Sequence, residues 1–171
     1  MKIVLLGYMG SGKSTIATYL SEKVQLPYKD LDACIEKKEG MSITSLFERK
    51  GEIYFRKVEH QVFRELLSSS DSFVLSLGGG TPCYANNHEL LQGDGIISIY
   101  LKTSIDQLCL RILKEKNFRP LLAKKRDDEL KEFIAQHLFE RSYFYNQATH
   151  FVVTDGKTPD EIVATIQQLL I

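Results

Sequence analysis

The sequence has no excess of either charge and no long hydrophobic run. Its 22 Lys and Arg residues balance 22 Asp and Glu residues in a chain of 171, so the formal net charge is +0. This balance argues against broad electrostatic binding to nucleic acid or to an anionic membrane. No apolar stretch approaches the roughly 20 residues of a membrane-spanning helix, and the apolar run Lys2–Leu6 is too short for the core of a signal peptide. We therefore expect a cytoplasmic protein with no nucleic-acid partner and no membrane attachment.

Cysteines are also scarce. The three cysteines, Cys34, Cys83 and Cys109, are far apart and form neither a C-x-x-C pair nor a zinc-binding spacing. They fit reduced thiols that pack as small hydrophobic residues. The chain also lacks internal repeats and low-complexity linkers, while 43% of its residues are hydrophobic. We therefore expect residues 1–171 to form a single domain with a proper core.

What the sequence does contain is a phosphate-binding motif. Residues 7–14, GYMGSGKS, match the P-loop pattern G-x-x-x-x-G-K-S/T and lie between a predicted strand and a predicted helix. Glycines let the backbone turn tightly and direct its N–H groups at a polyphosphate, which the positive end of the helix dipole also attracts. Lys13 is expected to reach the β- and γ-phosphates of a nucleotide, and Ser14 to ligate Mg²⁺. The alternative is a glycine-rich turn that binds nothing. The residues expected to bind the nucleotide here are Gly10, Ser11, Gly12, Lys13, Ser14 and Thr15.

Short apolar runs alternate with helical patterns along the chain. The central runs are continuously apolar, as in parallel strands that are covered on both faces, and the alternation predicts an α/β fold with right-handed crossovers. The predicted strands are Lys2–Leu6, Tyr28–Leu31, Phe73–Leu77, Ile96–Leu101 and Phe151–Thr154. The predicted helices are Lys13–Val24, Ala33–Glu39, Ile43–Leu67, Thr103–Lys116, Asp127–Gln147 and Pro159–Leu170.

Two aspartates follow the second predicted strand. In parallel α/β folds, ligands bind at the carboxyl ends of the strands, and side chains two residues apart in an extended segment point to the same side. We therefore expect Asp30 and Asp32 to face the site together. The alternative for Asp32 is a cap on the helix that follows it.

The third predicted strand ends in three glycines instead of an acidic residue. Many P-loop enzymes hold Mg²⁺ with an aspartate at this point, but only Ser76 is available there. Asp30 is therefore the candidate to complete the metal site with Ser14. Three glycines suggest that a ligand approaches the backbone closely, although a flexible loop would also use them. They are Gly78, Gly79 and Gly80.

Three arginines are candidates for binding anions. Arg141 lies on the apolar stripe of its helix, where a guanidinium needs an open cleft or an anionic partner, either a substrate carboxylate or an internal ion pair. Arg56 has Glu52 and Glu59 at a spacing that fits surface ion pairs equally well. Arg119 lies in a basic segment that could close over a nucleotide or remain a solvated loop. The four histidines show no paired spacing and receive no role.

These residues together resemble the shikimate kinase family over nearly the whole chain. The resemblance rests on the P-loop followed, in order, by DLD at 30–32, GExxFRxxE at 51–59, GGG at 78–80, RPLL at 119–122 and Arg141. It implies a P-loop kinase fold: a three-layer sandwich around a five-stranded parallel sheet, with a substrate-binding helical region at about 32–60 and a lid at about 112–126. It also implies a monomer that uses ATP and Mg²⁺ to phosphorylate the 3-hydroxyl of shikimate, on the route to chorismate and aromatic amino acids.

The resemblance also implies a role for each site residue. Asp32 would bind the shikimate hydroxyls and could accept the proton of the attacking one, and Asp30 with Ser14 would support Mg²⁺. Arg111 would lie near the adenine. The catalytic residues would be Lys13, Asp32 and Arg119, with Arg119 also contacting the nucleotide. The shikimate-binding residues would be Asp32, Arg56, Gly78, Gly79, Gly80 and Arg141.

Two departures from the family matter, and two other functions stay open. The interval from Arg111 to Arg119 varies in the family, which bears on the adenine contact of Arg111. The family usually reads R-x-P-x-Y where this chain has Arg141–Tyr145 without the proline. Another small-molecule kinase, similar to gluconate kinase, is one alternative, although the triple glycine and the GExxFR block do not resemble it. A guanine-nucleotide switch or a non-catalytic nucleotide-binding module is the other. The chain has no N-K-x-D motif for guanine, and it keeps Lys13, Asp32 and Arg119.

Overall fold

The computed structural model describes residues 1–115 and 127–171, with the backbone alone at Asp127. The expected lid at about 112–126 therefore lies mostly outside the described residues, and Arg119 lies outside them entirely. Among the described residues, no helix combines the length and the apolar composition that crossing a membrane requires.

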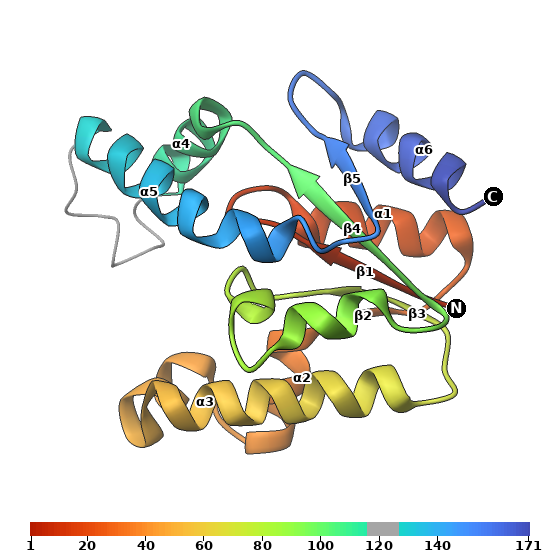
Figure 1. Cartoon of the computed structure of the whole chain (residues 1–171), viewed down its shortest axis with the longest axis vertical. Helices are drawn as coiled ribbons and strands as arrows, with labels where there is room; N and C mark the ends of the chain where they lie inside the picture. Colours follow the sequence, from red (N-terminus) through yellow and green to blue (C-terminus); the bar gives the residue numbers. More distant parts are fainter. Residues whose placement is uncertain (116–126) are drawn as a thin grey trace.

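A five-stranded parallel sheet forms the centre of the protein, which confirms the predicted fold class (Figure 1). The strand order is β2-β3-β1-β4-β5. The register pairs Leu5 of β1 with Ser76 of β3, and Asp30 of β2 with the same Ser76. The order brings the carboxyl ends of β1, β2 and β3 side by side at one edge. The strands are β1 (Lys2–Leu6), β2 (Tyr28–Asp30), β3 (Phe73–Ser76), β4 (Ile96–Lys102) and β5 (His150–Val153).

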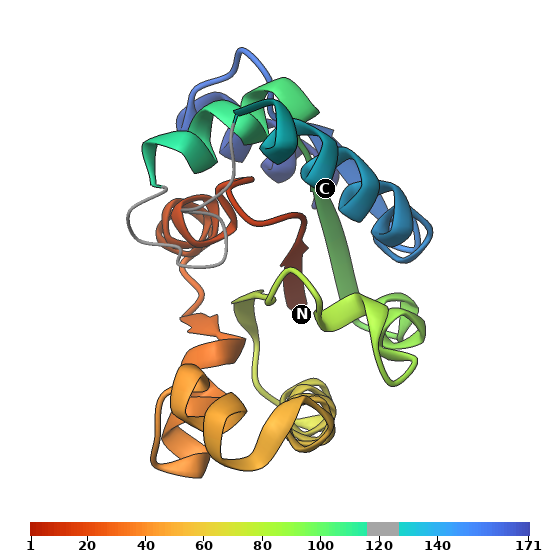
Figure 2. The same cartoon turned by 90° about the vertical axis from the view of Figure 1, so that its left-hand side faces the viewer.

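Helices cover both faces of this sheet because alternate strand residues point to opposite sides. On one face, Ile3 and Leu5 pack against buried residues of α1 and α6. On the other face, Val4 and Leu6 share a core with buried residues of α2, α3, α4 and α5. Figure 2 shows α2 and α3 at one end of the molecule, α4 and α5 at the other, and α1 between them. The helices are α1 (Lys13–Val24), α2 (Leu31–Glu39), α3 (Ile43–Ser68), α4 (Ile105–Lys114), α5 (Asp127–Tyr145) and α6 (Pro159–Leu169).

Side-chain caps set where several helices begin. Ser42 accepts a hydrogen bond from the backbone of Ser45 at the start of α3, and Ser104 does the same for Gln107 in α4. Thr158 and Glu161 form a reciprocal capping box on α6. Such caps satisfy backbone N–H groups that the first helical turn leaves without partners.

The start of α2 corrects one sequence prediction. Asp30 and Asp32 are not two residues of one extended segment, because α2 begins at Leu31. Asp30 caps the helix by accepting a hydrogen bond from the backbone N–H of Ala33. The cap is therefore Asp30, whereas the sequence alternative placed it at Asp32. Asp32 belongs to the first helical turn, yet both side chains still border the same cleft.

Two further features were not predicted from the sequence. The long helix α3 is broken at Gly51, whose backbone is non-helical with φ 82° and ψ 171°. Two short 3₁₀ helices, η1 (Thr81–Cys83) and η2 (Asn87–Gln92), follow the triple glycine. Their few residues carry no clear periodicity, so the pattern gave no signal for them. They bring Thr81 and Asn87 into the interior, where both are fully buried.

Candidate functional site

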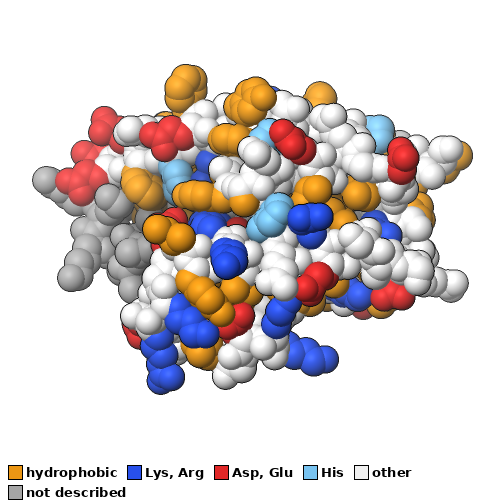
Figure 3. Space-filling view, turned by 60° about the horizontal axis from the view of Figure 1, so that its bottom comes forward, with side chains coloured by type: hydrophobic (Ala, Val, Ile, Leu, Met, Phe, Trp, Pro, Cys, Tyr) orange, Lys and Arg blue, Asp and Glu red, His pale blue; other side chains and the backbone are white. Residues whose placement is uncertain are grey.

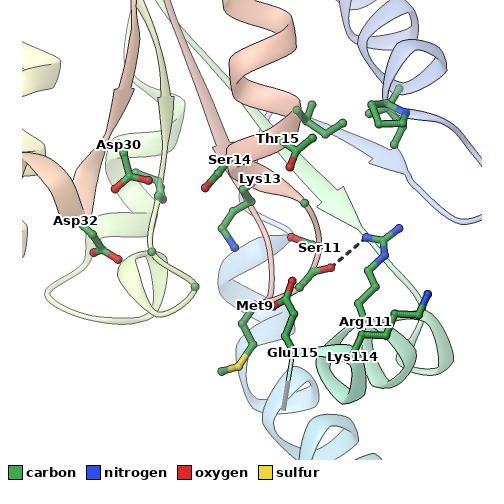
Figure 4. A pocket seen from close by; sticks show the side chains of 18 of the residues that line it. Met9, Ser11, Lys13, Ser14, Thr15, Asp30, Asp32, Arg111, Lys114 and Glu115 are labelled. Atoms are coloured by element: carbon green, nitrogen blue, oxygen red, sulfur yellow. Dashed lines mark hydrogen bonds between the residues drawn. The ribbon is translucent and has the colours of Figure 1, made fainter. Parts of the chain in front are cut away.

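A cleft of about 600 Å³ opens at the carboxyl ends of the strands. Its walls come from the P-loop and the start of α1, from the ends of β2 and β3, from the end of α4, and from the start of α6. Figure 4 shows Lys13 between Asp30 and Asp32 on one side and Arg111 and Lys114 on the other. A cleft in this position agrees with the rule that ligands of parallel α/β folds bind beyond the strand ends.

The P-loop backbone has the conformation that its glycines permit. Gly10 and Gly12 have φ of 82° and 90°, values that residues with a side chain rarely adopt. Gly12 precedes α1 and makes no side-chain cap, so the helix start presents backbone N–H groups to the cleft. Ser11 is buried, and within the described part of the chain its Oγ has no hydrogen-bond partner. Such a loop is suited to a polyphosphate, as the motif predicts.

Lys13 and Arg111 bring positive charge to this loop. Lys13 Nζ donates to the carbonyl oxygens of Gly7 at 2.7 Å and of Tyr8 at 3.1 Å. Arg111, on α4, donates from Nη1 to the carbonyl oxygen of Gly10 at 3.0 Å. The structure therefore places Arg111 against the P-loop, at the nucleotide side of the cleft. Its predicted contact with adenine stays a prediction.

Asp30 is held by three groups at the end of β2. Its Oδ1 accepts from Ala33 N at 2.9 Å, and its Oδ2 accepts from Ser76 Oγ at 2.9 Å and from Tyr28 Oη at 3.3 Å. Ser76 occupies the β3 position where the sequence analysis found no metal-binding aspartate. The serine hydroxyl thus fixes the carboxylate that the neighbouring strand supplies. Among the described residues, no group of three or more His, Cys, Asp or Glu side chains forms a metal cluster.

Asp32 has an unusual environment for a carboxylate. Burial, the largest cause, together with the negative charges of Asp30, Glu59 and Glu36, raises its pKa from 3.8 to about 6, while Lys13 opposes the shift. Its Oδ1 lies 3.4 Å from the position that a Cβ on Gly78 would occupy. A carboxylate that titrates near neutrality beside a phosphate-binding loop is suited to orient a hydroxyl or to accept its proton.

Arg56 reaches the triple-glycine loop from α3. Its Nη1 donates to Glu59 Oε1 at 2.8 Å, and its Nε lies 3.8 Å from Glu52 Oε1. Both pairs that the sequence allowed are therefore present, but Glu59 is only 1% exposed and so is not a surface partner. The guanidinium stacks 3.8 Å from the ring centroid of Tyr84. A Cβ on Gly80 would lie 2.8 Å from Arg56 Nη2, so glycine is needed for this approach.

Arg141 reaches the same loop from α5. Its Nη1 lies 3.2 Å from the position of a Cβ on Gly79 and 3.5 Å from Tyr145 Oη. Tyr145 Oη donates to the carbonyl oxygen of Gly79 at 2.6 Å. Burial raises the pKa of Tyr145, so its hydroxyl keeps the proton that it donates. The chain has no proline between Arg141 and Tyr145, and α5 continues unbroken to Tyr145. The arginine and the tyrosine therefore lie one helical turn apart.

The triple glycine connects the two halves of the site. A Cβ on Gly79 would lie 3.6 Å from the backbone nitrogen of Met9 in the P-loop, as well as close to Arg141. Gly78 adjoins Asp32, and Gly80 adjoins Arg56. The structure thus brings all the described sequence-predicted residues to one region. It does not describe Arg119.

Sequence reasoning gave no role in the site to several residues of this region, including Glu59, which it considered only as a surface partner of Arg56. Glu59 and Tyr145 hold the two arginines, and Thr81 donates to Glu59 from a fully buried position. The GExxFRxxE block contained the signal for Glu59, since it follows Arg56 by three positions on one helix face. Lys157, which lines the cleft, follows the last strand, so the strand-end rule could have indicated it.

One face of the protein carries side chains of both signs of charge. Figure 3 shows Lys and Arg side chains next to Asp and Glu side chains, with hydrophobic side chains between them. This mixture agrees with the balanced composition of the chain.

Comparison of the sequence with known proteins gives one consistent result. The family model described as shikimate kinase matches residues 9–171. A shikimate kinase from Flavobacterium johnsoniae is 59% identical over 169 residues, covering 99% of this chain and 98% of its own. A shikimate kinase from Flavobacterium psychrophilum is 50% identical with the same coverage.

Solved structures agree with the sequence comparison. The crystal structure of shikimate kinase from Bacteroides thetaiotaomicron superposes with a TM-score of 0.89 at 34% identity, covering 99% of this chain and 98% of the other. Shikimate kinase from Acinetobacter baumannii in complex with shikimate gives a TM-score of 0.84 at 33% identity, covering 99% and 92%. Both the sequence and the fold are therefore similar to proteins of one named activity.

Proposed function

The chain belongs to the shikimate kinase family, and from this premise we propose that it transfers the γ-phosphoryl group of ATP to the 3-hydroxyl of shikimate. The products are shikimate 3-phosphate and ADP, on the route to chorismate and aromatic amino acids. One observation carries the assignment to this site. The triple glycine touches the P-loop on one side and two arginines, Arg56 and Arg141, on the other. A phosphoryl donor and a carboxylate-bearing acceptor can therefore be held next to each other.

The two arginines are the proposed clamp for the shikimate carboxylate. A guanidinium matches a carboxylate in two-pronged hydrogen bonding. Arg56 already pairs with Glu59. Among the described residues, Arg141 contacts the hydroxyl of Tyr145 and the ring of Tyr8 but no acidic group. The backbone of Gly78, Gly79 and Gly80 is the proposed contact for the rest of the ring.

Asp32 is the proposed group at the attacking hydroxyl. In its ionised form it would accept a hydrogen bond from that hydroxyl, orient it, and receive its proton as the new bond forms. Lys13 and Arg111 stand on the donor side of the cleft and would balance the charge of the phosphates. We propose the same role for Arg119, which lies outside the described residues. Positioning and electrostatic stabilisation would thus supply most of the rate enhancement.

Mg²⁺ fits the oxygen donors on the donor side. The Ser14 side chain is exposed to the cleft at the start of α1, and Asp30 faces it from the end of β2 (Figure 4). Hydroxyl, carboxylate and water oxygens are the ligands that Mg²⁺ prefers, usually with several waters retained. Ser14 and Asp30 are therefore the residues that would hold it. When bound, the ion would neutralise charge on the β- and γ-phosphates.

We further propose that the enzyme acts as a monomer in the cytoplasm and binds no nucleic acid. One chain supplies every site residue described above. All three cysteines are free, which suits a reducing compartment. The balanced charge gives no general attraction to a polyanion.

An ADP-release assay with a panel of acceptors tests the proposed function. Shikimate should support turnover with MgATP, while gluconate and a nucleoside monophosphate should not. Turnover with gluconate but not with shikimate would favour the gluconate-kinase-like alternative. No turnover with any acceptor, combined with tight nucleotide binding, would favour a non-catalytic module.

A further inference from the structure

We propose that the buried Thr81 and Asn87 and the half-buried His60 form a hydrogen-bond chain that positions Arg56 for the carboxylate of the acceptor. The inference rests on the proposed function, because it concerns how the acceptor clamp is held. None of these three residues would touch the acceptor itself. They would act through Glu59, which lies between Thr81 and Arg56.

The chain is continuous from α3 through the two 3₁₀ helices and back to α3. His60 Nδ1 lies 2.6 Å from Asn87 Oδ1, and Asn87 Nδ2 donates to the carbonyl oxygen of Thr81 at 2.9 Å. Thr81 Oγ1 donates to Glu59 Oε2 at 2.9 Å. Glu59 Oε1 then accepts from Arg56 Nη1 at 2.8 Å. Each link is within normal hydrogen-bond distance.

The direction of each hydrogen bond follows from the donors available. The amide nitrogen of Asn87 donates to the carbonyl oxygen of Thr81, so the amide oxygen faces His60. His60 must therefore carry its proton on Nδ1 and donate it. Thr81 has a single hydroxyl proton, which it gives to Glu59. The carboxylate of Glu59 is thus left to accept from Arg56 with its other oxygen.

Because most of this chain is buried, the loss of one of its hydrogen bonds would affect the position of Arg56. Thr81 and Asn87 are 0% exposed and Glu59 is 1% exposed, so water cannot replace a lost partner easily. A Glu59 carboxylate without Thr81 would be under-solvated and free to rotate. Arg56 Nε is itself buried and has no hydrogen-bond partner among the described residues. The guanidinium therefore depends for its position on Glu59, on the longer ion pair with the exposed Glu52 and on its stacking with Tyr84.

Glu59 also lies between Arg56, which is proposed to bind the acceptor carboxylate, and Asp32, which is proposed to face the attacking hydroxyl. Glu59 Oε2 lies 3.7 Å from the position of a Cβ on Gly78, where Asp32 Oδ1 lies at 3.4 Å and Thr81 Oγ1 at 3.1 Å. Thr81 and Glu59 thus meet beside the glycine that adjoins Asp32. A displaced Glu59 would move Arg56 and alter the surroundings of Asp32 together.

Paired variants of Thr81 provide the first test. Thr81→Val keeps the shape but removes the hydroxyl, whereas Thr81→Ser keeps the hydroxyl. We expect Thr81→Val to raise KM for shikimate about tenfold, with KM for ATP unchanged, and Thr81→Ser to restore the wild-type value. If both variants lower kcat and raise both KM values equally, the hydroxyl has only a structural role and the proposal is overturned.

A second pair of variants, at His60, and an NMR measurement on the ligand-free protein complete the test. His60→Asn retains a donor near the Nδ1 position, whereas His60→Leu removes it, so only His60→Leu should raise KM for shikimate. In the ligand-free protein, NMR should show the guanidinium signals of Arg56 broadened in Thr81→Val and His60→Leu but not in Thr81→Ser. Unchanged Arg56 signals in both disruptive variants would refute the chain. If the wild type does not phosphorylate shikimate, the proposed function fails, while this NMR comparison still decides whether the chain holds Arg56.

Discussion

Tyr145 on α5 donates a 2.6 Å hydrogen bond to the carbonyl oxygen of Gly79 in the triple-glycine loop. The two residues are 66 positions apart in the sequence, and Tyr145 is fully buried. The same hydroxyl lies 3.5 Å from Arg141 Nη1. This contact therefore fixes the loop against α5 and fixes Arg141 against the loop.

Removing the hydroxyl in Tyr145→Phe should weaken both the fold and the acceptor site. The partly buried carbonyl oxygen of Gly79 would lose its hydrogen-bond donor, which should lower the free energy of unfolding by about 1 kcal/mol. Because Arg141 would also lose a neighbour, KM for shikimate should rise several-fold. Urea denaturation and steady-state kinetics measure the two effects. Tyr143→Phe is the matched control, since Tyr143 is on the same helix and 62% exposed, and a similar loss in that variant would contradict the explanation.

Arg56→Lys should damage acceptor binding while leaving nucleotide binding intact. Lysine keeps the positive charge but cannot make two parallel hydrogen bonds to a carboxylate, nor stack on Tyr84 as a flat guanidinium does. We expect KM for shikimate to rise by at least about tenfold with KM for ATP unchanged. Arg64→Lys, at an exposed position of the same helix α3, is the control and should behave as wild type. An equal rise in both KM values would count against a role confined to the acceptor.

Activity should fall on acidification through the pKa of Asp32. Burial and neighbouring carboxylates raise that pKa to about 6, so the ionised form needed to orient the hydroxyl is lost below this pH. The value of kcat/KM for shikimate should therefore decline below about pH 6. In Asp32→Asn, activity should be low and this acidic limb should disappear. Near-normal kcat in Asp32→Asn would show that the carboxylate is not essential.

The same shift predicts that Asp32 lowers stability at neutral pH. In the unfolded chain Asp32 ionises near 3.8, whereas in the folded protein it holds its proton up to about 6. Protonated Asp32 therefore stabilises the folded state, relative to the ionised form, fully below pH 3.8. This stabilisation is lost as pH rises through about 6. Asp32→Asn avoids this cost and should be more stable than wild type above pH 7, by on the order of 2 kcal/mol. Urea denaturation at several pH values measures the difference, and equal stability at pH 8 would contradict it.

Gly80→Ala tests the position of Arg56 without changing the arginine. The backbone of Gly80 has φ −89°, which alanine can adopt. Its new methyl group would nevertheless lie 2.8 Å from Arg56 Nη2, so the guanidinium must move. KM for shikimate should rise about tenfold with little loss of stability. Gly93→Ala is the control, because it has φ −68° and a 2.9 Å approach to Ile96 Cδ1 at a site remote from the cleft, and it should leave KM unchanged.

Much of the fold could be predicted because its signals are local. The continuously apolar strands and the P-loop each depend on a few adjacent residues. A local error was at Asp30–Asp32, where the helix begins at Leu31, two residues before the predicted start at Ala33. A single cap decides that boundary, and either aspartate is a good cap residue.

The candidate site was predictable only in part, for a physical reason. The strand-end rule and the apolar stripe of α5 identified Asp32 and Arg141 one at a time. How Arg56 is held depends on contacts between distant segments, such as Thr81 with Glu59, 22 positions apart, and His60 with Asn87, 27 positions apart. No spacing rule specifies such pairs, because they depend on how η1 and η2 pack against α3.

The identity of the phosphorylated product is the most direct test of the proposed reaction. Wild-type protein incubated with MgATP and shikimate should yield ADP and one new phosphate ester, and a ³¹P–¹H correlation spectrum should place that phosphate on carbon 3 of the ring. A phosphate on another hydroxyl would contradict the placement of Asp32 at the attacking group. Release of inorganic phosphate alone, with shikimate recovered unchanged, would contradict the assignment of the site as a shikimate kinase.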